Sequence, residues 1–348
     1  MTEAAGQDED LVRLEAIVAE HRAKLAAEPD AAFPAYADAL MGLAAKQADQ
    51  GKLDEALSTA EEGAGHFRLL FDADPAAFAV ALASALNNLS NRLSDLGRDD
   101  EARQAGDEAF GLARRAVSTN PDQARFVLVS TLMNQSGRSW RAGQSLRAIE
   151  EIGTAVETFR EGGEALFSFL GVMVDALHRN AMALSEAGRW EEAVMVRRLT
   201  AQLFPDERVP APVSHLLALT LQQNAFAASR DGRPGESLPL VEEAVELARD
   251  LAEMAPEQYR LFLAQSLANL ASRQHEAHAD AEALDSALEA VNAFQEVAKV
   301  DAASAIVPLS ATLETFAAIL TTLGHDAQAA NVLAQREQLM SVVKPVED

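Results

Sequence analysis

The sequence predicts an all-α solenoid of about seven helix–turn–helix repeats with a leading cap helix. The first observation is a glycine that returns every 44 to 46 residues along the 348-residue chain. The second is that each such marker follows a leucine by eleven positions and a small residue by seven, and precedes another small residue by five. Repeats that keep a fixed frame are typical of stacked repeat proteins, because one copy cannot bury its apolar face alone. The markers are Gly51, Gly97, Gly143, Gly188, Gly232, His278 and Gly324.

The frame has a physical reason at each of its positions. The leucine and the small residue before the marker are four residues apart, so they share one face of the first helix. The small residue after the marker lies on the second helix, and two small side chains let the helices approach closely. The marker ends the first helix, where glycine adopts positive φ without a Cβ penalty, and histidine adopts it at some cost. The leucines are Leu40, Leu86, Leu132, Leu177, Leu221, Leu267 and Leu313; the preceding small residues are Ala44, Ser90, Ser136, Ala181, Ala225, Ala271 and Ala317; the following ones are Ala56, Ala102, Ala148, Ala193, Ser237, Ala283 and Ala329.

This frame resembles that of the tetratricopeptide repeat family, and it can be read in all seven repeats over residues 35–343. The stretch Leu86-Asn87-Asn88-Leu89 resembles the core of the long-helix repeats of the kinesin-light-chain type. HEAT and armadillo repeats have a similar period of ~40–47 residues, against ~34 for most tetratricopeptide repeats, but they lack the glycine and small-residue frame. The resemblance implies a right-handed superhelical solenoid whose first helices line a concave groove.

The elements follow from this register. Residues 1–8 are expected to be disordered, 9–27 to form the cap helix, 9–343 to be one domain and 344–348 to be a frayed tail. The three prolines in 204–212 predict a bend, and the prolines and glycine at 234–239 predict a late start for the second helix of repeat 5. The other predicted helices are near 35–50, 53–72, 76–96, 99–119, 122–142, 144–161, 165–187, 190–203, 257–277, 281–298, 303–323 and 326–342.

Composition excludes several classes of function. The chain has 54 acidic and 29 basic residues and a net charge of −25, so we expect no nucleic-acid partner, because phosphate binding needs clustered Lys and Arg. The absence of cysteine excludes a disulfide and a thiolate site and suits the cytoplasm. We expect no membrane partner either, because we find no stretch of apolar residues that approaches the ~18 needed to span a bilayer.

Motifs for catalysis are missing as well. His275 and His278 are three residues apart near a helix end, but zinc needs further ligands and none is near in sequence. There is no P-loop, dinucleotide fingerprint or G-x-S-x-G. We therefore predict no enzyme, no metal and no cofactor.

Side-chain amides on the first helices point to peptide binding. Asn is disfavoured inside helices, yet Asn87, Asn88 and Asn91 share one helix. An amide offers both a donor and an acceptor, which suits the backbone of an extended peptide. By the resemblance these residues line the groove together with aromatic anchors and with arginines that can pair with a carboxylate. The candidate partner-binding residues are Asn87, Asn88, Asn91, Asn134, Trp140, Arg141, His178, Arg179, Gln222, Gln223, Phe226, Arg230 and Asn269.

A carboxylate clamp of the co-chaperone type is only partly matched. Asn91, Asn134 and Arg179 fit the clamp positions, but Asn87 and Asp175 stand where the family has lysine. Asp175 would repel the C-terminal carboxylate of a peptide. The same amides and arginines could instead bridge neighbouring helices and bind nothing.

The sequence therefore predicts a non-catalytic scaffold that binds a peptide segment or a partner protein in the concave groove of repeats 2–5. One alternative is a ligand-sensing or regulatory subunit of a larger enzyme or signalling system. Another is a structural protein that self-assembles through its terminal helix. The sequence predicts neither the identity of the partner nor the oligomeric state.

Overall fold

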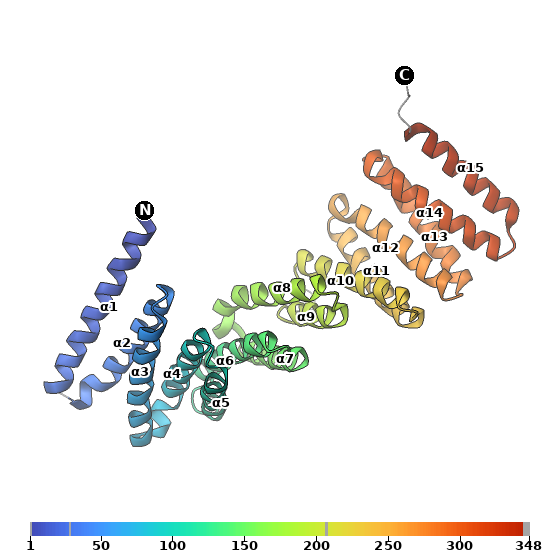
Figure 1. Ribbon diagram of the computed structural model, residues 1–348. Coiled ribbons are helices and arrows are strands. Elements are labelled where there is room, and N and C mark those ends of the chain that lie inside the picture. The colour runs from blue at the N-terminus through green and yellow to red at the C-terminus, as the bar shows by residue number, and fades with distance from the viewer. Residues whose placement is uncertain (1, 28, 206–207, 344–348) are drawn as a thin grey trace. The chain divides into compact units, whose positions relative to one another are not determined.

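The computed structural model describes residues 2–27, 29–205 and 208–343, and within these ranges the regular elements are all helices (Figure 1). Consecutive helices from α1 to α7 and from α9 to α15 pack against each other, and so do the first-helix pairs α2 with α4, α4 with α6, α10 with α12 and α12 with α14. The elements are α1 (Thr2–Ala27), α2 (Pro29–Asp49), α3 (Leu53–Ala73), α4 (Pro75–Asp95), α5 (Asp99–Ala116), α6 (Pro121–Arg141), α7 (Ser145–Gly162), the 3-10 helix η1 (Gly163–Phe169), α8 (Leu170–Glu186), α9 (Trp190–Gln202), α10 (Ala211–Arg230), α11 (Pro234–Met254), α12 (Pro256–Glu276), α13 (Asp280–Ala298), α14 (Ala302–Thr322) and α15 (Asp326–Val343).

The chain divides into two compact units, an N-terminal unit (Met1–Val174) and a C-terminal unit (Asp175–Asp348). The single solenoid domain expected over 9–343 stays a prediction. The division falls in α8, directly after η1 interrupts the regular alternation of α-helices. Each unit is described by itself below. The right-handed superhelix stays a prediction.

The repeat frame is confirmed at every position. All seven markers have positive φ, from 60° at His278 to 79° at Gly324, and His278 is the one non-glycine residue with positive φ in the described part of the chain. Every leucine and every small residue of the frame is at most 4% exposed. Ser90 shows how close the helices come, because its Oγ donates to the backbone oxygen of Ala102 across the pair at 2.5 Å. The frame thus fixes both the turn and the packing of each repeat.

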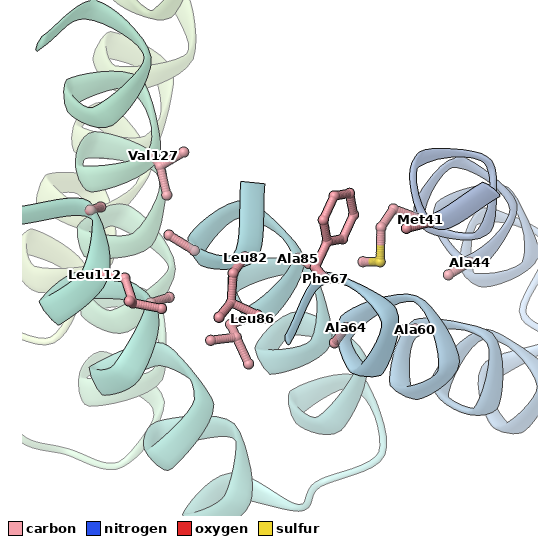
Figure 2. Packing of buried hydrophobic residues seen from close by; sticks show 14 of the residues in the cluster. Met41, Ala44, Ala60, Ala64, Phe67, Leu82, Ala85, Leu86, Leu112 and Val127 are labelled. Carbon is pink, nitrogen blue, oxygen red and sulfur yellow. The ribbon is translucent and has the colours of Figure 1, made fainter. Parts of the chain in front are cut away.

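The core of the N-terminal unit is one continuous layer of apolar side chains between α2 and α6. Figure 2 shows Leu82 and Leu86 of α4 facing Leu112 of α5, with Phe67 and Met41 at the neighbouring contact of α3 with α2. Burying a leucine, phenylalanine or methionine side chain fully stabilises the folded state by about 1.5–3 kcal/mol. This layer holds α2, α4 and α6 next to one another and so builds the surface on which the candidate site lies.

Helix starts differ from several expectations. The N-terminal helix begins at Thr2 and not at residue 9, so residues 2–8 are helical where disorder was expected, because Glu, Ala and Gln in this stretch favour helix. Helix α2 begins at Pro29, six residues before the predicted start of repeat 1. Helix α11 begins at Pro234 and not late, because proline is tolerated in a first turn.

Repeat 4 departs from the expected pattern at its beginning. The predicted helix over 165–187 is replaced by η1 followed by α8. Gly163, with a φ of 56°, follows the end of α7 and begins η1 two residues before the predicted helix. Residues 206–207 of the predicted bend at 204–212 lie outside the described residues, and so do residue 1 and the predicted tail 344–348. The bend stays a prediction.

Helix α14 is long and apolar enough to cross a membrane by length and composition, with a mean hydropathy of 1.6. This corrects the expectation that no segment approaches that length. Leu313 and Ala317, the leucine and the small residue of the repeat frame on this helix, are nevertheless buried in the C-terminal unit. In the apolar 18-residue stretch of the helix, 44% is buried. A core helix of a repeat array meets the same criterion.

Candidate functional site

The predicted site residues fall into both units. Asn87, Asn88 and Asn91 lie on α4, and Asn134, Trp140 and Arg141 lie on α6, in the N-terminal unit. The C-terminal unit holds His178 and Arg179 on α8, Gln222, Gln223, Phe226 and Arg230 on α10, and Asn269 on α12. A single groove through repeats 2–5 would involve both units and stays a prediction.

Several of the predicted residues bridge neighbouring first helices in the N-terminal unit. Asn134 Nδ2 on α6 donates to Asn87 Oδ1 on α4 at 3.1 Å, and Asn87 Nδ2 donates to Ser130 Oγ at 3.0 Å. Arg141 Nη2 donates to Ser94 Oγ at 2.7 Å. Asn87 is only 5% exposed. Asn87 therefore joins repeat to repeat, as the alternative interpretation of the amides holds, and has little surface left for a partner.

The C-terminal unit repeats this bridge in the same register. Asn269 Nδ2 on α12 donates to Gln222 Oε1 on α10, and Gln222 Nε2 donates to Ser266 Oγ, both at 2.7 Å. Gln222 and Asn87 stand ten residues before their markers, whereas Asn269 and Asn134 stand nine before theirs. An amide pair between successive first helices is thus a recurrent device of the stacking, and each hydrogen bond contributes about 0.5–1.5 kcal/mol net.

A second group of predicted residues is left without such partners. Among the residues that the structure describes, Asn88, Asn91, Trp140, Gln223 and Phe226 make no hydrogen bond through their side chains. Asn88 and Asn91 are half-buried, and Phe226 is 58% exposed. An amide that is half-buried and unpaired can still donate to and accept from the backbone of a bound chain.

A pocket with a volume of about 470 Å³ lies between α2, α4 and α6 in the N-terminal unit. Met41 and Phe67 are buried side chains in its lining, and Phe126 is 47% exposed at it. The ring of Phe126 contacts Phe169 edge to face, with ring centres 4.3 Å apart. Asn88 lines the same pocket. Apolar walls with a few polar groups are the common make-up of a binding pocket.

Sequence reasoning missed the apolar part of this pocket. Phe67 belongs to the second helix of repeat 1, and Phe126 lies near the start of the first helix of repeat 3, eight residues before the nearest candidate Asn134, so neither was a candidate. Asp38 also lines the pocket. It stands thirteen residues before its marker, as does Ser84, which lines the same pocket. The repeat register could therefore have indicated Asp38 once Ser84 was placed.

Two smaller pockets hold most of the other predicted residues. In the N-terminal unit Asn91, Asn134 and Arg141 line a pocket of about 260 Å³ between α4 and α6. In the C-terminal unit a pocket of about 300 Å³ between α10 and α12 is lined by Gln222, Gln223, Phe226 and Asn269. Each unit thus gathers its own predicted residues on its first helices.

His178, Arg179 and Arg230 have different surroundings. His178 Nδ1 accepts from Arg197 Nη1 at 2.9 Å, because a guanidinium has no acceptor. Arg197 is 3% exposed, and burial lowers the pKa of its guanidinium. Arg179 is exposed, and Arg230 lies 3.5 Å from the carboxylate of Asp231. His178 therefore contacts the second helix of its own repeat.

The described residues show no cluster of three or more His, Asp or Glu side chains that could hold a metal ion. Of the two histidines considered in the sequence, His275 pairs through Nδ1 with Asp280 at 2.5 Å. His278 provides the positive φ of the marker position. Both histidines thus have structural roles in repeat 6.

Comparisons with known proteins agree with the repeat frame. The tetratricopeptide repeat family model matches residues 82–122, and no curated protein matches the sequence significantly. Among solved structures, BtubC from P. vanneervenii is 14% identical with a TM-score of 0.31, over 85% of this chain and 96% of that one. A STAND protein with a tetratricopeptide repeat sensor from Pyrococcus horikoshii is 13% identical with a TM-score of 0.37, over 95% of this chain and 47% of that one.

The nuclear import adaptor Nro1 of S. pombe is 14% identical with a TM-score of 0.37, over 76% of this chain and 93% of that one. Likenesses this low carry no functional argument, and the resemblance to the kinesin-light-chain type stays a prediction. The matched segment 82–122 lies in repeats 2 and 3, and all seven repeats share the same buried frame. Residues 82–122 therefore match a tetratricopeptide repeat, and the same frame returns along the rest of the chain.

Proposed function

We propose that this protein is a non-catalytic scaffold that binds a peptide segment of a partner protein on the first helices of its N-terminal unit. The observation that carries the proposal is the pocket between α2, α4 and α6, which combines an apolar lining with the unpaired amide of Asn88. An apolar side chain of the partner would contact Met41, Phe67 and Phe126, and the amide would bond the partner's backbone.

The neighbouring pocket between α4 and α6 extends this surface along the same two helices. Asn91 and Asn134 line it and supply further amide groups. A peptide that crosses both pockets would meet apolar contacts first and amides next. This arrangement suits recognition of a backbone together with one anchoring side chain, because main-chain bonds give affinity and the pocket gives specificity. The cytoplasm remains the proposed location.

The test begins with selection of peptides from a displayed random library on the full-length protein. The selected peptide is then measured by fluorescence anisotropy on the intact chain, on Asn88→Ala and on Phe126→Ser. Gln104→Ala and Leu69→Ser are the matched controls, because both residues are exposed on second helices. We expect the two pocket variants to weaken binding about tenfold, which corresponds to about 1.4 kcal/mol, and the controls to leave it unchanged.

Equal affinity for all five proteins would refute the proposal and move the site to another surface. Thermal unfolding of each variant checks that the fold is intact, since Phe126 also contacts Phe169. The two alternatives predicted from the sequence, a regulatory subunit and self-assembly through the terminal helix, stay hypotheses.

A further inference from the structure

The pocket between α2, α4 and α6 carries charge of one sign. Asp38 on α2 and Asp122 on α6 line it, and no lysine or arginine does. The two carboxylates come from different first helices of the same unit and border the same apolar lining. The pocket is therefore an apolar cavity with two anionic groups.

Neither carboxylate has a cationic partner within the described part of the protein. Asp38 and Asp122 make no ion pair and no hydrogen bond through their side chains there. Elsewhere in the N-terminal unit arginines pair with carboxylates of the same kind, as in Arg22–Glu62 at 3.1 Å, Arg68–Glu108 at 2.7 Å and Arg92–Asp95 at 3.0 Å. The pocket lacks the counter-charges that other carboxylates of this unit have.

The surroundings of Asp38 penalise its charge. Its side chain is exposed, yet desolvation by the surrounding protein raises the pKa of its carboxyl. Asp122 has a local role as well, because it lies in the first turn of α6, where a negative charge interacts favourably with the helix dipole. Asp38 lies in the interior of α2, where the helix dipole does not stabilise its negative charge. A cation from a bound molecule would offset the penalty at Asp38.

We infer that the segment bound here is basic, with an apolar side chain inserted against Met41 and Phe67 and a neighbouring lysine or arginine at Asp38 and Asp122. This inference rests on the proposed function and names the chemistry of its partner. The volume of about 470 Å³ lies in the usual range for ligand pockets. The net charge of −25 would also steer a cationic segment towards the protein.

The probes are four synthetic peptides on one Gly-Ser backbone. Three contain Leu-Phe flanked by Lys, by Glu or by Ser, and the fourth has the Lys flanks with Ser in place of Leu-Phe. Binding to the full-length protein is measured by anisotropy at low and at moderate salt. The variants are Asp38→Asn/Asp122→Asn and, as the matched control, Asp54→Asn/Glu157→Gln. Asp54 lies in the first turn of α3 and Glu157 in the interior of α7, and both are exposed.

We expect the Lys-flanked apolar peptide to bind more tightly than the Ser-flanked one, and the Glu-flanked one to bind least. In Asp38→Asn/Asp122→Asn the advantage of the Lys flanks should fall by about three- to tenfold, because each partly exposed ion pair contributes modestly. Added salt should reduce the same advantage. The control variant should behave as the intact protein.

Four results would overturn the inference. If the Lys and Glu flanks bind equally, or if the Lys advantage survives in Asp38→Asn/Asp122→Asn, the pocket does not select a basic segment. If all three Leu-Phe peptides bind alike and all lose affinity in Phe126→Ser, the inference fails while the proposed function stands. If none of the four peptides binds and the display selection also enriches nothing, both fail.

Discussion

Two substitutions at repeat markers, one from glycine to alanine and one from histidine to glycine, test whether the markers recur in the repeat for their positive φ. Gly97 has a φ of 73°, and a Cβ built there meets nothing within 4 Å. The cost of Gly97→Ala is thus conformational: about 1–2 kcal/mol for a left-handed residue with a Cβ, less about 0.4–1 kcal/mol because alanine restricts the unfolded chain. We expect a net destabilisation of about 0.5–1 kcal/mol.

His278 provides the reverse experiment. Its φ is 60°, its side chain is exposed, and in the described part of the protein it makes no side-chain hydrogen bond. His278→Gly removes the backbone strain and gives up few side-chain contacts. It should therefore raise the free energy of unfolding by about 0.5–1 kcal/mol. Urea unfolding of the full chain, followed by circular dichroism, measures both variants. A loss of stability in His278→Gly, or no change in Gly97→Ala, would refute the assignment of the marker.

Three further predictions concern packing and binding. Asn87→Ala should lower the free energy of unfolding by about 1 kcal/mol, because it leaves Asn134 Nδ2 without its acceptor; an unchanged urea midpoint would contradict the bridge. Ser90→Leu should cost about 1–3 kcal/mol by overpacking the contact with Ala102, and urea unfolding as stable as that of the intact chain would show that the helices can separate there. Desolvation raises the pKa of Asp38, so its carboxylate is present above that raised pKa and lost as pH falls through it. As the pH is lowered, binding of the Lys-flanked peptide measured by anisotropy should therefore weaken. The weakening should begin at a higher pH than it would for an ordinary aspartate, whose pKa is about 3.9. It should be smaller in Asp38→Asn.

The fold could be predicted from the sequence because the frame is local. A leucine, two small residues and a glycine specify one repeat, and each of these positions takes in the structure the role that its chemistry indicates. The exceptions arise where two signals compete. At the start of repeat 4 a 3-10 helix begins at Gly163 where the register predicts an α-helix from residue 165, and Pro234 starts a helix where a cluster of prolines suggested a delay.

The candidate site was predicted less completely, for a physical reason. Groove positions are defined on first helices alone, whereas the pocket also takes the side chain of Phe67 from a second helix. The amides could be placed on the correct helices, but their partners could not. Asn87 is paired with Asn134, whereas Asn88 next to it makes no such bond within the residues that the structure describes, because a one-residue step turns a side chain by about 100° around the helix.

The most direct test of the central claim locates the bound peptide on the N-terminal unit. A display-selected peptide with a photoactivatable group in place of its apolar anchor is crosslinked to the full-length protein, and the modified residues are identified by mass spectrometry. We predict crosslinks to the residues around the pocket, above all Met41 and Phe126. Crosslinks confined to α5 and α7, or to the C-terminal unit, would contradict the claim that this pocket is the binding site.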